Sequence, residues 1–295
     1  MEIVESPSRR RPLLPLVGRT LRVTVTGALL LLCSISTFAQ YDATGETTEQ
    51  VVQLRVGAEF GKTWDRQGVK LSIGEELRFN LYDAQAGTNA KGTVVDGNLG
   101  ASFNKSYTTL ALRYMHPDFE YIKADAGYTL RLLGDKGWSD PNEFLRHRIF
   151  FGATAQYKMR YAKIHLRERA VCDIRTDSVN VLEKNKVNWL LRSRIGADFY
   201  ILQKPNVKPY VWCELENTLN VPTYQQRNGN QYISHVRTQA GVNWRVSKRS
   251  SLDFYYRFQY GYNRDINITK KKDYVQLTEE TTYLHAIGIA YHFGW

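Results

Sequence analysis

Long segments with a strict two-residue period constrain this chain more than any other feature. From Ser251 to Asn263, mostly Leu, Phe and Tyr alternate with Asp, Arg, Gln and Asn, and 69–81 and 232–246 follow the same rule. A two-residue period indicates β-strands with one apolar and one polar face. These segments have about 12 to 15 residues, whereas strands of globular proteins usually have about 5 or 6 and membrane-crossing strands need about 9 to 11. Their length favours a transmembrane β-barrel.

Twelve segments of this character follow one another along the chain. They are 51–61, 69–82, 94–103, 107–115, 121–133, 145–158, 161–174, 187–200, 207–217, 231–246, 250–263 and 281–295. From the fifth segment on, long and short connections alternate, as in barrels with short periplasmic turns and longer outer loops. The first half is less regular, because the connection 83–93 is long where a short turn is expected. We predict an all-β, closed antiparallel transmembrane β-barrel of about 12 strands, with about 10 or 14 as the alternatives.

The N-terminus has the layout of a secretory signal peptide. Basic residues up to Arg22 precede an apolar segment from Val23 to Ile35, and Thr37 and Ala39 are small residues before a cleavage point after Ala39. The apolar segment is shorter than the roughly 20 residues that a membrane-spanning helix needs. Removal of this peptide takes away five Arg and two Glu and lowers the net charge from +11 to +8. The predicted division of the chain is a signal peptide over 1–39, an N-terminal periplasmic linker over 40–50 and the barrel domain over 51–295.

The composition fits a barrel with lipid outside and polar groups inside. Phe, Trp and Tyr make up 13% of the chain, yet the mean hydropathy is −0.43. A hydrophobic content of 43% argues against a disordered chain, and three Cys cannot form a dense disulfide scaffold. The alternative is a soluble lipocalin-like barrel or a sandwich. The last segment disfavours it, because Tyr283, Tyr291 and Phe293 share a face that is too bulky for a small barrel interior.

These features predict a protein of the cell outer membrane, in contact with outer-membrane lipids and lipopolysaccharide. The last strand has Tyr291, Phe293 and Trp295 at alternate positions, as in strands that the barrel assembly machinery reads. We therefore expect that machinery as a partner. The basic run 270–272 in an expected outer loop is interpreted as solvated charge, and nucleic acid is not expected as a partner.

Several short motifs occur along the chain in a characteristic order. They are Glu76-Leu77-Arg78-Phe79, Leu145-Arg146-His147-Arg148, Leu166-Arg167-Glu168-Arg169, Leu191-Arg192-Ser193-Arg194, Lys208-Pro209-Tyr210 followed by Glu214-Leu215-Glu216-Asn217, and Ser251-Leu252-Asp253-Phe254-Tyr255-Tyr256-Arg257. Their order resembles the Bacteroidota outer-membrane family catalogued as domain of unknown function 2490, over roughly residues 51–295. The signal ending Phe38-Ala39-Gln40 is also similar to exported proteins of that phylum. The resemblance implies a β-barrel in the outer membrane and carries no activity with it.

Charged residues on the polar strand faces are expected to line the barrel interior. An Arg that faces lipid near the membrane centre costs about 2 to 4 kcal/mol, which disfavours the opposite orientation. The candidate lumen-facing residues are Arg146, Arg148, Arg192, Arg194, Arg237, Arg245, Arg257, Glu76, Glu214 and Asp253. Two interpretations stay open. The groups either pair across neighbouring strands and close a narrow lumen, or form a basic pore in which rows of Arg bind carboxylates or phosphates and pass them along.

Three functions are consistent with such a barrel. The first is a narrow, anion-preferring channel with an Arg-lined lumen, whose partners are small anionic solutes. The second is a structural or adhesive barrel with an ion-paired, closed lumen. The third, which we rank lowest, is a lipid-modifying enzyme. His147 and His285 fall on the outer face, but no Ser lies two residues from either on its strand, so we expect no catalytic residues and no enzyme activity.

The remaining reactive residues point to no cofactor chemistry. The six His are scattered without metal-ligand spacing, so we expect neither a metal site nor a cofactor. Cys172 and Cys213 fall on strands separated by a third, about 9.5 Å apart against a limit of roughly 7 Å for a disulfide, which predicts two free, lipid-facing thiols. By strict alternation Glu75 and Glu168 fall on the lipid face, which a β-bulge or a shifted register would explain.

Overall fold

The described residues form a β-barrel. The computed structural model describes residues 46–89, 92–116, 119, 121–134, 144–177, 185–201, 206–220, 233–268 and 275–295. The chain divides after Thr44 into two units, and the barrel belongs to the second of them. The expected signal peptide 1–39, residues 40–45 of the expected linker and the basic run 270–272 lie outside the described residues. Residues 46–50 of the expected linker are part of the first strand.

Eleven β-strands and a short 3-10 helix make up the elements of the described residues. The strands are β1 (Glu46–Trp64), β2 (Val69–Asn89), β3 (Gly92–Met115), β4 (Ile122–Leu133), β5 (Leu145–Lys158), β6 (Ala162–Arg175), β7 (Val187–Phe199), β8 (Val207–Thr218), β9 (Ile233–Arg245), β10 (Ser250–Ile268) and β11 (Val275–Gly294). The 3-10 helix η1 (Asp65–Gln67) joins β1 to β2, and Gly68 ends it with a φ of 65°, a conformation that glycine adopts without strain. Within the described ranges no helix is long and apolar enough to cross a membrane.

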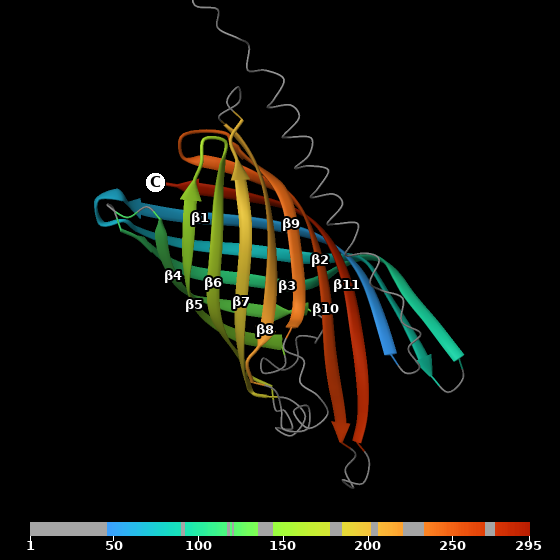
Figure 1. Ribbon diagram of the computed structural model, residues 1–295. Helices are drawn as coiled ribbons and strands as arrows, with labels where there is room; N and C mark the ends of the chain where they lie inside the picture. Colours follow the sequence, from blue (N-terminus) through green and yellow to red (C-terminus); the bar gives the residue numbers. More distant parts are fainter. Residues whose placement is uncertain are drawn as a thin grey trace, which may run out of the picture. The chain divides into compact units, whose positions relative to one another are not determined.

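The strands close into one barrel, which confirms the predicted all-β fold (Figure 1). Each strand pairs with its neighbours in the chain through antiparallel ladders, and β1 closes the barrel against β11. That closing pair is parallel, with Glu46 beside Glu279 and Gly61 beside Gly294. The strand count of eleven in the described chain differs from the expected even number, and an odd count forces the first and last strands to run in the same direction.

A β-bulge explains the difference in strand count. The segments 94–103 and 107–115 were predicted as two strands, but both belong to β3. Arg78 pairs with Lys105 and Phe79 pairs with Phe103, so Asn104 is an extra residue without a partner in the ladder. A bulge bends a strand and leaves it continuous. The expected long connection 83–93 is also mostly strand, divided between β2 and β3.

The two ends of the barrel differ in their connections. At the end where β11 finishes, the strands are joined by short connections such as 159–161 and 246–249. At the other end lie longer connections, including 176–186 and 219–232, as predicted for the second half of the chain, but β2 and β3 are joined there by 90–91 alone. Neighbouring strands β10, β11, β1, β2 and β3 have 19 to 24 residues, whereas β4 to β9 have 12 to 14. The barrel wall therefore has a long-stranded side and a short-stranded side.

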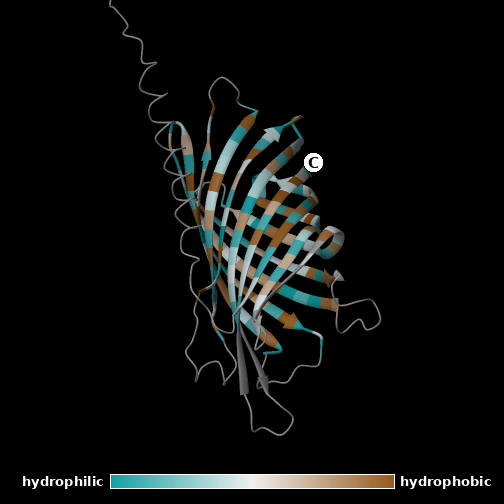
Figure 2. Ribbon diagram, turned by 90° about the vertical axis from the view of Figure 1, so that its right-hand side faces the viewer, coloured by the Kyte–Doolittle hydropathy of each residue, from teal (hydrophilic) through white to brown (hydrophobic). Residues whose placement is uncertain are grey.

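Alternation along the strands separates two surfaces. Hydrophilic and hydrophobic residues follow one another along the strands in Figure 2. Ile195 and Phe151 expose 59% and 53% of their surface on the outside of the barrel. Glu214 and Glu216, at the alternate positions of β8, expose only 2% and 4% because they point into the interior, which we call the lumen. A polar interior and an apolar exterior reverse the arrangement of a soluble globular domain.

Candidate lumen site

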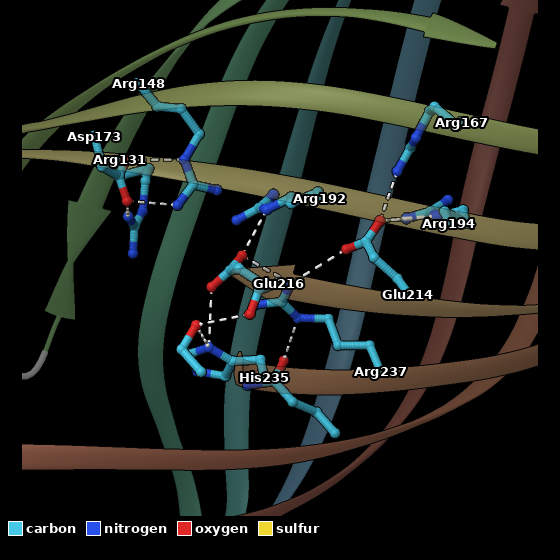
Figure 3. Close-up of polar contacts among 12 residues, drawn as sticks. Arg131, Arg148, Arg167, Asp173, Arg192, Arg194, Glu214, Glu216, His235 and Arg237 are labelled. Carbon is cyan, nitrogen blue, oxygen red and sulfur yellow. Dashed lines mark hydrogen bonds and ion pairs between the residues drawn. The ribbon is translucent and has the colours of Figure 1, made fainter. Parts of the chain in front are cut away.

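Glu214 on β8 is a point of convergence for arginines from three strands (Figure 3). Arg167 on β6 donates from Nη2 at 2.7 Å, and Arg194 on β7 donates from Nε at 2.8 Å. Arg237 on β9 donates from Nη1 to the other carboxylate oxygen at 3.2 Å. The four residues occupy one row of partners across the ladders, so alternation alone turns them all inward. One carboxylate therefore holds three guanidinium groups.

Glu216, two residues further along β8, forms a second such centre. Arg192 donates from Nε at 2.6 Å, and Arg237 donates from Nη1 at 2.9 Å. His235 places its Nδ1 at 2.9 Å from the other oxygen. Because Arg237 contacts both Glu214 and Glu216, the two centres share a guanidinium and form one connected structure.

Asp173 on β6 is the third centre, shown on the left of Figure 3. Arg148 on β5 binds it in a bidentate manner, with Nε at 2.9 Å and Nη2 at 2.6 Å. Arg131 on β4 donates from Nη1 at 2.8 Å across the intervening strand. Two parallel hydrogen bonds between a guanidinium and a carboxylate fix the orientation of both groups. We call the ion-paired residues of these three centres the central network: Arg131, Arg148, Arg167, Arg192, Arg194, Arg237, Asp173, Glu214 and Glu216.

Strand register places several arginines directly opposite one another. Arg131, Arg146 and Arg175 are successive partners across β4, β5 and β6, and Arg167 faces Arg194. Like charges in such positions repel. Near the long connections Asp177 relieves the repulsion, since it accepts from Arg146 at 3.0 Å and lies 3.4 Å from Arg175. Each of the carboxylates Asp173, Asp177, Glu214 and Glu216 thus contacts at least two arginines.

The other residues predicted from sequence occupy several separate places. Glu76 accepts from Arg78 Nε at 2.6 Å on the same strand. Asp253 accepts from the hydroxyl of Tyr210 at 2.9 Å. Arg257 donates from Nε to the amide oxygen of Gln239 at 2.7 Å.

Arg245 does not join these contacts. It is exposed at the end of β9, where its ladder partner is Ser251 and its backbone N–H donates to the carbonyl oxygen of Asn206. Arg245 lies an even number of residues from Arg237 on β9, so its assignment to the lumen face stays a prediction, and it lies outside the central network. Several inward-facing residues of the wall are absent from the predicted set, namely Arg55, Arg78, Asp125, Arg131, Arg167, Arg169, Asp173 and Arg175. On β6 the alternation of Arg167, Arg169 and Asp173 with apolar residues was a signal that could have found them.

A cavity of about 330 Å³ lies in the lumen beside the central network. Arg78 on β2 lines it from the long-stranded side, and Arg148, Arg169 and Arg192 line it from the short-stranded side. Gly57 and Gly74 lie on the opposite side, on β1 and β2, where a side chain would approach backbone oxygens at 3.3 Å. Three arginines of the short-stranded side therefore lie across the cavity from the two glycines of the long-stranded side.

Two carboxylates remain on the outer face, and neither lies at a bulge. Glu75 has regular partners in both ladders and accepts hydrogen bonds from Ser106 Oγ at 2.6 Å and Thr108 Oγ1 at 2.5 Å. Glu168 also has regular partners and accepts from Ser193 Oγ at 2.7 Å. The proposed bulge or register shift is therefore wrong, and hydroxyl groups on the neighbouring strand explain how these carboxylates are accommodated.

Within the described residues, the cysteines and the outer-face histidines form no further site. Cys172 and Cys213 are both free and lie on β6 and β8 with β7 between them, as predicted. His147 and His285 on the outer face hydrogen-bond tyrosine hydroxyls, Tyr128 at 2.6 Å and Tyr256 at 2.7 Å. In the part of the chain that the structure describes, no group of His, Cys, Asp and Glu has the arrangement of a metal site.

Comparisons with known proteins identify the family of this chain. A solved structure described as "NanC porin structure in rhombohedral crystal form" shares 7% sequence identity, covers 70% of this chain and 86% of its own, and has a TM-score of 0.36. A likeness of this size establishes neither a common fold nor a common function. Among curated proteins none matches. Residues 61–269 match the family model described as protein of unknown function (DUF2490), and the chain therefore belongs to this family.

Proposed function

We propose that this protein is an outer-membrane β-barrel whose lumen passes small anions. The excess of positive charge in the central network carries the proposal, since six guanidinium groups share three carboxylates. Each Arg has five N–H donors in a planar fork, so donors remain after the carboxylates are satisfied. A passing carboxylate or phosphate would find a row of such donors.

The ion pairs connect strands of one wall and leave the lumen open, which supports passage of ions. The pairs of the central network join strands that are neighbours or next-but-one in the barrel, such as Arg192 with Glu216 and Arg131 with Asp173. They run along the wall and leave the cavity of about 330 Å³ in front of it. A plug would need contacts between opposite walls, whereas these contacts hold the arginines against one wall.

The strand lengths and the outer surface support a membrane location. Strands β4 to β9 have 12 to 14 residues, enough for the roughly 9 to 11 that a tilted crossing requires. Large apolar residues such as Ile287 face outward with 61% of their surface exposed. We further propose the outer-membrane lipids, lipopolysaccharide and the barrel assembly machinery as partners, the last through Tyr291 and Phe293 on β11.

A closed structural or adhesive barrel is the second candidate. The bidentate contact of Arg148 with Asp173 favours it, because well-paired ions hold a wall rigid without conducting. Lipid hydrolysis ranks lowest, since the hydroxyls that contact His147 and His285 belong to tyrosines and not to an activated serine.

Conductance in planar bilayers tests the proposal. With a tenfold KCl gradient across the bilayer, we expect channels whose reversal potential has the sign of chloride permeation. The double variant Arg192→Gln, Arg194→Gln leaves four guanidinium groups for three carboxylates and should lower the chloride-to-potassium permeability ratio. Arg249→Gln, in an exposed short turn outside the central network, serves as the matched control and should leave the ratio unchanged. Absence of channels, or a preference for potassium, overturns the proposal in favour of the closed barrel.

A further inference from the structure

Two arginines enclosed by the barrel have no carboxylate partner among the described residues. Arg55 donates to the amide oxygen of Gln53 from Nε at 3.3 Å and Nη2 at 3.0 Å, and Arg257 donates to Gln239. Ten other arginines of the lumen each contact a carboxylate: Arg78, Arg131, Arg146, Arg148, Arg167, Arg169, Arg175, Arg192, Arg194 and Arg237. Arg55 and Arg257 therefore carry charge that these carboxylates leave uncompensated.

These two arginines lie close together because the strand between them has small inward residues. On β11 the ladder partner of Arg55 is Gly288, and the partner of Arg257 is Ala286. Neither offers a side chain that could separate the two guanidinium groups or neutralise them. Tyr255 on β10 lies across the glycine, since a Cβ at Gly288 would overlap its ring. The geometry brings a tyrosine ring and two cations together over β11.

A third arginine completes the group. Arg78 on β2 is the direct ladder partner of Arg55 on β1, so the two cations point inward side by side. Glu76 pairs with Arg78 at 2.6 Å and is the acidic member of the group. The group thus contains three guanidinium groups and one carboxylate, which contacts Arg78 alone among them, and its net charge is +2. We call Arg55, Arg78, Arg257 and Glu76 the Arg55 cluster.

Burial makes this uncompensated charge significant. Arg55 exposes 0% of its surface, and its Nη1 has no hydrogen-bond partner within the described structure. A buried charge without a counterion and a buried donor without an acceptor both destabilise a folded protein. Like charges on directly opposed strand positions add to the effect. An anion bound to the cluster would reduce both of these costs.

We propose that the Arg55 cluster binds a doubly charged oxyanion such as phosphate or a phosphate monoester. The ligand's charge of −2 would cancel the cluster's +2, and its oxygens suit the planar fork of guanidinium donors. Arg78, Glu76 and Gly57 also line the lumen cavity of about 330 Å³, which gives the ligand a route to the cluster. The site deepens the proposed function, since it lies in the same lumen and would give the pore a saturable binding step.

Binding of inorganic phosphate to the purified, detergent-solubilised protein tests this site without any need for conduction. Thermal unfolding is followed at about pH 8, where phosphate is mostly doubly charged, with phosphate exchanged for chloride at constant ionic strength. We expect phosphate to raise the unfolding midpoint in a saturable manner.

Arg55→Met should weaken phosphate binding about tenfold or more, because it removes charge-assisted hydrogen bonds. Without phosphate, Arg55→Met should raise the midpoint, since it removes the unpartnered charge.

Arg257→Met provides a second test in case Arg55→Met fails to fold, and it should weaken binding in the same way. Arg245→Met removes an exposed Arg and should leave phosphate binding as in the unchanged protein. Equal binding by all three variants, or no response of the unchanged protein to phosphate, overturns the site. Phosphate binding without channels would refute the pore and keep the site, whereas anion-selective channels without phosphate binding would refute the site alone.

Discussion

Replacing Glu214 with glutamine is expected to lower the free energy of unfolding by about 3 to 5 kcal/mol. Glu214 is 2% exposed and accepts from Arg167, Arg194 and Arg237. A neutral amide keeps the size of the side chain and removes its charge. Arg167 and Arg194 then lose their carboxylate and face each other across β6 and β7 without a counterion, while Arg237 retains Glu216. Removing one member of a buried ion pair costs this much because the remaining charge stays buried.

Urea-induced unfolding in detergent micelles measures this change. Glu168→Gln is the matched control, because that carboxylate lies on the outer face and accepts a hydrogen bond from the neutral Ser193. We expect the control to change the free energy of unfolding by about 0.5 kcal/mol or less. If both variants lose the same stability, the guanidinium groups around Glu214 do not depend on its charge, and the central network does not stabilise the barrel through its ion pairs.

Replacing Ile195 with arginine is expected to cost about 2 to 4 kcal/mol in a lipid bilayer. Ile195 lies near the middle of β7 on the outer face, with 59% of its surface exposed, between the inward-facing Arg194 and Gly196. A barrel that crosses the membrane would place the new guanidinium in hydrocarbon. A barrel in water would gain a solvated surface charge and lose little stability.

Folding into lipid vesicles, compared between two positions, measures this cost. Val246→Arg is the matched control, because Val246 is also outward and 52% exposed but follows the end of β9 at the short connections. Near a membrane interface the cost of Arg falls to about 0 to 1 kcal/mol. A cost at Ile195 no larger than the cost at Val246 would contradict a membrane-crossing barrel.

Strand periodicity was sufficient to predict the barrel and to orient many of its charges. Arg192 and Arg194 were assigned to the interior from alternation alone, and both contact carboxylates there. Alternation states which face a residue occupies but not which residues meet. The contact of Arg167 with Glu214 joins residues 47 positions apart across an intervening strand, so it exists only once the wall is assembled.

Periodicity did not predict the continuity of β3 at Asn104 or the lack of a carboxylate partner for Arg55. Asparagine favours turns, yet the neighbours of Asn104, Phe103 and Lys105, both pair with β2. Pairing in the ladder therefore outweighs the preference of Asn104 for a turn. The position of Arg55 was readable from the alternation of β1. Its lack of a carboxylate was not, because that depends on Gly288 and Ala286, which lie on a strand more than 200 residues away and reach it only at closure.

The parallel pairing of β1 with β11 has a consequence for any attempt to join the chain into a circle. In a barrel with an even number of strands the first and last residues lie at the same rim, and a few residues could connect them. Here Gly61, and not Glu46, lies beside Gly294. A linker from Gly294 to Glu46 would have to follow the wall for 15 residues of strand, about 50 Å at 3.3 Å per residue. Circular permutation of this barrel therefore requires the equivalent of one additional strand, and with that strand the number would be even.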